Sequence, residues 1–156
     1  ETLPESLLKA LLNARFFQSG MQSLRQIEFA LFDLSIHKAA PALKADQIQA
    51  TLNEIRAQYA VLETTPYNRF QHSFSHIFAG GYAAGYYSYK WAEVLASDAF
   101  DRFENEGIFN TATGKEFRQF ILAVGGKDTA LDAFINFRGR EPKIDALLRH
   151  QGWTNR

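Results

Sequence analysis

Apolar residues recur every three or four positions over most of the chain, which is the period of amphipathic α-helices. One such run starts at Pro4 and stops at Gly20, and a second spans 21–38 and is followed by a proline. We predict that these two runs form helices that pair as a hairpin. A third helix is predicted to begin at Asp46, as its N-cap, and to end near Tyr59.

The same period continues in the second half of the chain. It predicts helices over 82–105, 113–124, 129–138 and 143–149, and glycines follow the middle two. No short run combines β-branched side chains with strict alternation, so no strand is predicted. The predicted class is therefore all-α, a multi-helix bundle. Because repeats, low-complexity tracts and linkers are absent, we expect a single helical domain over 1–156.

Charge and composition exclude several classes of function. Seventeen lysines and arginines balance seventeen aspartates and glutamates, so no long-range field attracts nucleic acid or an anionic membrane, and neither is expected as a partner. The lack of cysteine excludes a disulfide framework and a thiol nucleophile and is compatible with a reducing compartment. Without an apolar run of about 18 residues or a signal-peptide pattern, we expect a soluble, cytoplasmic protein.

The segment Phe74–Trp91 contains one histidine, a glycine pair and four tyrosines within eighteen residues. If the chain is helical from Gly81 onward, three of these tyrosines are spaced i, i+4, i+7 and present their hydroxyls on one face. The three are Tyr82, Tyr86 and Tyr89. Tyr87 and Trp91 would then lie on a separate face, toward the core. A row of hydroxyls away from the core suggests a binding site, and the alternative is that these rings pack between helices with their hydroxyls reaching the surface.

Two of the four histidines, His72 and His76, have the i, i+4 spacing of a helical metal pair. Ser73 stands where the HExxH motif has its glutamate, however, and no third ligand follows at a usable spacing. Three interpretations therefore remain: a metal site in a standalone bundle, histidines with structural or exposed positions, or a functional His76 beside the tyrosines. The acidic residues after the tyrosines have a pattern typical of a solvated helix face. They are Glu93, Asp98, Asp101, Glu104 and Glu106.

Several short motifs are distributed along the chain and are distinctive in combination. They are Leu3-Pro4-Glu5, Leu24-Arg-Gln-Ile-Glu28, Leu31-Phe-Asp33, Phe74-Ser-His76, Ala79-Gly-Gly-Tyr82, Tyr86-Tyr87, Tyr89, Trp91, Arg118, Gly125-Gly126 and Phe137-Arg-Gly-Arg-Glu-Pro142. In this combination the chain resembles the thimet oligopeptidase family of zinc metallopeptidases. The likeness covers essentially the whole chain and is strongest to bacterial members.

The resemblance implies that much of an enzyme is missing from this chain. Family members bind zinc through the two histidines of an HExxH helix and a glutamate of a following helix, all N-terminal to the region that this chain resembles. Neither element is present here. The chain therefore resembles the C-terminal helical part of a larger zincin-type metallopeptidase, a metalloendopeptidase that hydrolyses short peptides. We expect no metal ligand and no zinc in this chain, and no peptidase activity without the N-terminal part of the same enzyme.

The resemblance also implies roles for the segment Phe74–Trp91. His76, Tyr82 and Tyr89 match positions that contact substrate and stabilise the oxyanion of the transition state, and Tyr86 matches a substrate-contacting tyrosine. Gly80 and Gly81 match a flexible loop that positions substrate. One departure is the spacing between His76 and Gly80, which is one residue longer than in some family members, especially animal ones. The alternative from another class is an autonomous helical module that binds a peptide or protein without catalysis.

Overall fold

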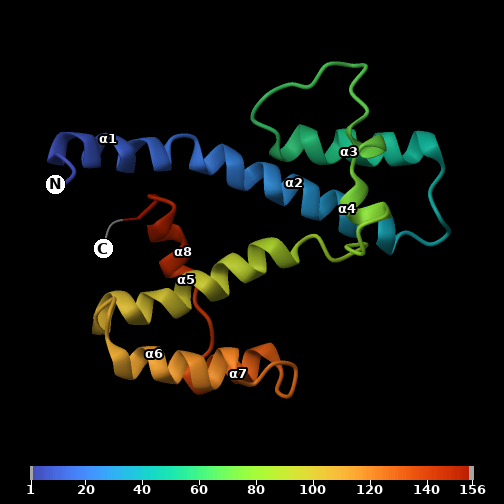
Figure 1. Ribbon diagram of the computed structural model, residues 1–156. Helices are drawn as coiled ribbons and strands as arrows, with labels where there is room; N and C mark the ends of the chain where they lie inside the picture. The colour runs from blue at the N-terminus through green and yellow to red at the C-terminus, as the bar shows by residue number, and fades with distance from the viewer. Residues whose placement is uncertain (1, 155–156) are drawn as a thin grey trace. The chain divides into compact units, whose positions relative to one another are not determined.

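The structure is a computed structural model that describes residues 2–154 (Figure 1). The α-helices are α1 (Glu5–Phe16), α2 (Ser19–Lys38), α3 (Ala45–Tyr59), α4 (Ser75–Phe78), α5 (Ser88–Glu106), α6 (Thr111–Phe117), α7 (Ala130–Arg138) and α8 (Asp145–His150). A 3₁₀ turn, η1 (Phe70–His72), precedes α4, and a π-helical turn, η2 (Arg118–Leu122), follows α6. No strand occurs within residues 2–154, and the predicted all-α class is confirmed.

The chain divides into two compact units, 1–90 and 91–156. Helix α5 begins in the first unit and continues into the second. The expectation of a single domain stays a prediction. None of the helices within the described residues is long and apolar enough to cross a membrane.

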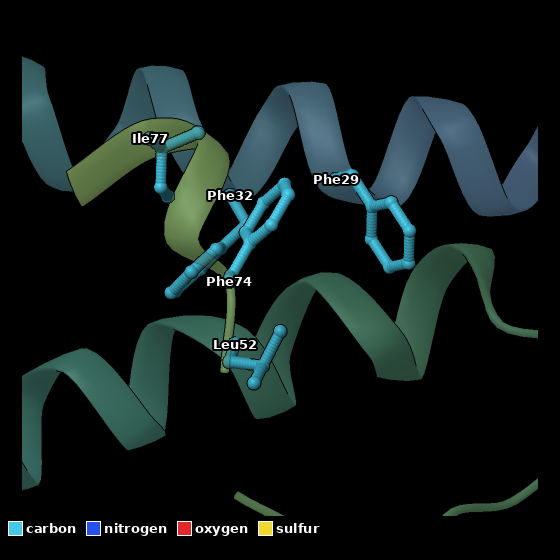
Figure 2. Packing of buried hydrophobic residues seen from close by; sticks show 5 residues of the cluster. All are labelled: Phe29, Phe32, Leu52, Phe74 and Ile77. Carbon is cyan, nitrogen blue, oxygen red and sulfur yellow. The ribbon is translucent and has the colours of Figure 1, made fainter. Parts of the chain in front are cut away.

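The core of unit 1–90 lies between α2, α3 and the short segment around α4 (Figure 2). Phe32 of α2 and Leu52 of α3 have no exposed surface, and Ile77 of α4 is 2% exposed. Phe29 and Phe74 complete the cluster, and their rings are 5.3 Å apart. Aromatic rings of α2 thus hold the chain on both sides of His76, because Phe74 and Ile77 are both anchored in this core.

The predicted hairpin of the first two helices is wrong. Helix α1 ends at Phe16, Gln18 takes a left-handed conformation (φ 56°), and α2 starts at Ser19, so Gly20 lies inside α2 and does not end a helix. Figure 1 shows α1 and α2 following one another roughly in line. The apolar side chains of α1 are not buried, so α2 does not fold back to cover them. The helices that pair are α2 and α3.

The expected cap of the third helix is displaced by two residues. Helix α3 starts at Ala45, and the N-cap position is Lys44, whose backbone N–H donates to Oε1 of Gln47 at 2.8 Å. Asp46 is therefore inside the first turn, where its negative charge favours the helix N-terminus without capping it.

Unit 91–156 has a second core, made by Ala99, Phe134 and Phe137. The predicted helix over 129–138 is confirmed: the Thr129 side chain accepts a hydrogen bond from the backbone N–H of Asp132, and Gly139 ends α7 with φ 72°. The predicted helix over 113–124 is present as α6 and η2, which ends at Leu122. The terminal helix is shifted slightly and spans Asp145–His150.

The acidic residues expected on a solvated face are instead largely engaged within this unit. Asp98 is 1% exposed and accepts hydrogen bonds from Arg140 at 2.6 Å, from Arg138 at 3.1 Å and from the backbone N–H of Lys143 at 2.7 Å. Burial alone would raise the pKa of Asp98, but the hydrogen bonds from Arg140 and Lys143 and the charge of Arg138 lower it below its ordinary value. The solvated-face prediction is wrong for Asp98, because its partners come from residues about 40 positions away in sequence.

Candidate functional site

The segment that carries the tyrosines is a loop followed by a helix. The helix predicted to begin at Tyr82 begins at Ser88, since Gly81 (φ 78°) and Ala84 (φ 53°) both adopt left-handed backbone conformations that an α-helix does not accept. The argument from i, i+4, i+7 spacing on one helix face is therefore wrong. Tyr87 and Trp91, expected to face the core, are 51% and 52% exposed, so that expectation is also wrong.

The loop nevertheless brings the predicted site residues together. The rings of Tyr82 and Tyr89 stack with centroids 5.1 Å apart, and the ring of Tyr86 lies 5.1 Å from that of Tyr89. The His76 ring is 6.3 Å from Tyr82, 5.9 Å from Tyr86 and 6.4 Å from Tyr89. We refer to His76, Tyr82, Tyr86 and Tyr89 as the phenol cluster. All four belong to unit 1–90.

Gly80 and Gly81 make the turn between α4 and the tyrosines. The backbone N–H of Gly80 donates to the Ser75 carbonyl at 2.8 Å, and that of Tyr82 donates to the His76 carbonyl at 3.1 Å. A Cβ added at Gly80 would lie 2.9 Å from the His76 carbonyl oxygen, closer than real Cβ contacts allow, and the positive φ of Gly81 favours glycine. Both glycines are thus needed to place Tyr82 beside His76.

Two side chains of α2 hold the loop, and sequence reasoning gave neither of them a role. Asp33, which has no exposed surface, accepts from the backbone N–H of Ala84 through Oδ1 and from that of Tyr86 through Oδ2, each at 2.9 Å. The Tyr86 hydroxyl donates to Oε1 of Gln26 at 2.9 Å. Gln26 and Asp33 are seven residues apart, so they share a face of α2. The seven-residue spacing of these two polar side chains was the signal available in the sequence.

The tyrosines of the phenol cluster differ in exposure. Tyr82 and Tyr89 are 37% and 39% exposed, while Tyr86 is more buried. A hydrogen bond with the Tyr82 hydroxyl, followed by burial and by the neighbouring phenols, raises the pKa of Tyr89 above its ordinary value. Burial raises the pKa of Tyr86, partly opposed by the charge of Arg25. Both phenols therefore stay protonated at neutral pH and serve as hydrogen-bond donors.

The two histidines do not form the helical metal pair that their spacing suggested. His72 ends η1 and His76 lies in α4, with Ser73 and Phe74 between the two short helices. Within residues 2–154, no group of three or more histidine, cysteine, aspartate or glutamate side chains is arranged to hold a metal ion. The described residues therefore do not fit a zinc site. What the phenol cluster offers chemically is a set of neutral hydroxyl donors and one imidazole, with Tyr82 and Tyr89 accessible from solvent.

Comparison with known proteins gives consistent matches over the whole chain. The model of peptidase family M3 matches residues 1–153. The chain is 54% identical over 155 residues to oligopeptidase A of Haemophilus influenzae and 52% identical over 152 residues to oligopeptidase A of Escherichia coli. It is also 34% identical over 156 residues to saccharolysin of Saccharomyces cerevisiae. These alignments cover 97–99% of this chain but only 22–23% of the relatives, so the chain spans less than a quarter of their length.

Proposed function

The chain belongs to peptidase family M3, and from this premise we propose that it is the C-terminal part of a zinc-dependent oligopeptidase that hydrolyses short peptides. The resemblance to this family and to bacterial oligopeptidase A, which the motifs indicated, is confirmed by the identity of about half of all residues. A relative named "Probable cytosolic oligopeptidase A" supports a cytoplasmic enzyme, although another is named as organellar.

The phenol cluster supplies hydrogen-bond donors to the substrate in this proposal. When a peptide bond is attacked, negative charge develops on the carbonyl oxygen, and donors placed in advance stabilise that charge. Tyr82 and Tyr89 suit this task because their rings are stacked at 5.1 Å and each is more than a third exposed. His76, whose ring lies within 6.4 Å of both, is the third proposed donor. The observation that carries the proposal is this gathering of exposed donors in a chain of peptidase family M3.

Tyr86 and the glycines have supporting roles. We propose that Tyr86 contacts the substrate with its ring, since its hydroxyl already donates to Gln26. Gly80 and Gly81 position substrate by forming the turn that places Tyr82 beside His76, and at Gly81, where an added Cβ would meet nothing within 4 Å, a peptide backbone can approach the loop. Peptides are thus the proposed partners of this surface.

The metal belongs to another part of the enzyme. Because the described residues do not fit a zinc site, we propose that zinc is bound by residues N-terminal to this chain and supplies a Lewis acid there. The isolated chain is then expected to lack peptidase activity. The alternative of an autonomous binding module is less well supported, because the family model matches residues 1–153 and the relatives are more than four times longer than the chain.

The test is Tyr89→Phe in the complete enzyme. Removing one donor that acts in the transition state is expected to lower kcat for a short quenched peptide about 100-fold, with KM little changed. Tyr87→Phe is the matched control, because Tyr87 is exposed and lies outside the phenol cluster, and its kcat should equal that of the wild type. An unchanged kcat in Tyr89→Phe overturns the proposed role.

A further inference from the structure

The loop that carries the phenol cluster has an unusual backbone. Between Phe78 and Ser88 the chain forms no helix or strand, and both Gly81 and Ala84 have positive φ. For alanine a left-handed conformation costs free energy, and it persists only where the surroundings impose it. Something must therefore hold residues 84–86 in place.

The groups that hold the loop come from α2. Asp33 accepts the backbone N–H groups of Ala84 and Tyr86 with its two separate oxygens, so it fixes the chain on both sides of Gly85. Its Oδ1 also lies 2.8 Å from Nδ1 of His37, one turn further along the same helix. Asp33 is fully buried, and its carboxylate makes all three of these contacts.

We propose that Asp33 is a positioning residue that sets where the hydroxyls of Tyr82 and Tyr89 point. Gly85 lies midway between the two tyrosines in sequence, so a shift of residues 84–86 moves Tyr82 relative to Tyr89. Tyr89 lies in the first turn of α5, whereas Tyr82 lies in the loop, where its backbone N–H donates to the His76 carbonyl. The stacking of the two rings at 5.1 Å therefore depends on the anchor at Asp33. This inference rests on the proposed function of the phenol cluster.

The chemistry of the anchor requires a carboxylate. Two N–H donors converge on Asp33, one at each oxygen. Asparagine has the same shape but only one acceptor oxygen, and its NH₂ group would face the second N–H. Asp33→Asn thus releases one side of the loop while leaving the volume of the core unchanged, which makes it a suitable probe.

A double-mutant cycle in the complete enzyme tests the inference. Asp33→Asn alone is expected to lower kcat for a short quenched peptide about 10-fold or more with little change in KM, because donors displaced by about 1 Å lose much of their effect. In a Tyr82→Phe background the same change should lower kcat less than about 3-fold, since the hydroxyl whose position depends on the anchored loop is already gone. A loss of the same size in both backgrounds overturns the inference.

Asp98→Asn is the matched control. Asp98 is also buried and also accepts a backbone N–H, from Lys143, but it lies in unit 91–156. Any loss of kcat that it causes should be equal in the wild-type and Tyr82→Phe backgrounds. The two proposals fail differently: an unchanged kcat in Tyr89→Phe overturns the function of the cluster, whereas a lowered kcat in Tyr89→Phe together with a fully additive loss from Asp33→Asn in the Tyr82→Phe background overturns the role of Asp33 alone.

Amide hydrogen exchange gives a readout that does not depend on activity. In Asp33→Asn one of the two amides of Ala84 and Tyr86, the one that faces the new NH₂ group, is expected to exchange at least 10-fold faster than in the wild type, with the amides of α3 unchanged. If Asp33→Asn does not fold, His37→Ala replaces it. His37 is partly exposed and contacts the Asp33 carboxylate only through Nδ1. It should give faster exchange at the same two amides and a smaller non-additive loss of kcat. Unchanged exchange at both amides overturns the inference.

Discussion

Each unit of the chain buries one aspartate, and the two carboxylates have different partners. Asp33 of unit 1–90 accepts two backbone N–H groups of a loop and contacts His37. Asp98 of unit 91–156 accepts from one backbone N–H and forms ion pairs with Arg138 and Arg140. Around Asp98 the charges are paired within the unit, whereas around Asp33 the contacts hold a loop that carries the partly exposed Tyr82.

The comparison separates motifs that fold the chain from motifs that act on another molecule. One motif as distinctive in sequence as the tyrosine segment is Phe137-Arg-Gly-Arg-Glu-Pro142. Its arginines, however, form contacts within the folded chain. Phe137 is buried in the core, Gly139 ends α7, and the two arginines bind Asp98. The phenol cluster keeps two partly exposed donors, Tyr82 and Tyr89, and this difference makes it the better candidate site.

The two units also carry different chromophores, which allows each to be followed separately. All six tyrosines lie within 1–90, and both tryptophans, Trp91 and Trp153, lie within 91–156. Tryptophan fluorescence of the 156-residue chain therefore reports on the second unit, and tyrosine absorbance on the first.

The largest expected effect is that of Asp98→Ala. The change leaves the guanidinium groups of Arg138 and Arg140 without their buried carboxylate, and removing one partner of a buried ion pair costs about 3–5 kcal/mol. Urea unfolding followed by tryptophan fluorescence should show this loss. Glu141→Ala, at an exposed carboxylate nearby, should change stability by less than about 0.5 kcal/mol. Equal midpoints for the two variants would show that the ion pairs around Asp98 do not stabilise this unit.

Gly80→Ala is expected to have the next largest effect, this time in unit 1–90. The new Cβ would meet the His76 carbonyl oxygen at 2.9 Å, so the turn must shift, at a cost of about 1–3 kcal/mol. Tyrosine absorbance during urea unfolding measures the loss. Gly20→Ala is the control: Gly20 lies in α2 with no atom within 4 Å of the added Cβ, so alanine should stabilise the helix by up to about 1 kcal/mol. If both variants are equally stable, the close approach at Gly80 is unimportant.

Local signals in the sequence predicted those helices whose ends are fixed by local chemistry. Thr129 caps α7 and Gly139 ends it, as both residue types indicated. The start of α5 was missed because the left-handed residue that delays it is Ala84, and alanine gives no such signal. The hairpin of the first two helices failed for a different reason: apolar spacing shows that a helix has an apolar face, but not which surface covers it.

The members of the candidate site were predictable, and their surroundings were not. His76, Tyr82, Tyr86 and Tyr89 gather as the sequence suggested, although a loop rather than a helix brings them together. Their roles in catalysis stay predictions. Asp33 was missed, and Asp98 was assigned to a solvated face, because their partners lie about 40 to 53 positions away along the chain. Contacts at that separation depend on tertiary packing, which spacing within one helix does not encode.

Acidification should weaken unit 91–156 through Asp98. Its pKa in the folded chain is lowered, so its contribution to stability is present above the ordinary value near 4 and is lost as the pH falls through the folded value. Tryptophan-detected urea midpoints should therefore fall more steeply below about pH 4 in the wild type than in Asp98→Asn, which has no carboxylate to titrate. Parallel pH profiles for the two proteins would contradict this expectation.

The smallest expected effect lies at the opposite end of the pH scale and in the other unit. The pKa of Tyr89 is raised by its hydrogen bond with Tyr82, and that of Tyr86 by burial, so both titrate later than an ordinary phenol with a pKa near 10. Folding thus favours the protonated forms of the two phenols. Their contribution to the stability of the folded chain is fully present below the ordinary pKa and is lost as the pH rises through the pKa values of the folded state.

The ionisation of Tyr86 and Tyr89 above the ordinary phenol pKa forms a late phase in a pH titration, and tyrosinate absorbance measures this phase directly. In Tyr89→Phe the absorbance change of this phase should be smaller by one phenol, and the contribution of Tyr86 should remain. In Tyr87→Phe the contributions of Tyr86 and Tyr89 should both remain. A late phase that Tyr89→Phe leaves intact would mean that the Tyr82 and Tyr89 hydroxyls are not hydrogen-bonded in solution. The hydroxyls of Tyr82 and Tyr89 would then not be held in place before a substrate binds. The phenol cluster would differ from the ion pairs around Asp98 only in being more exposed.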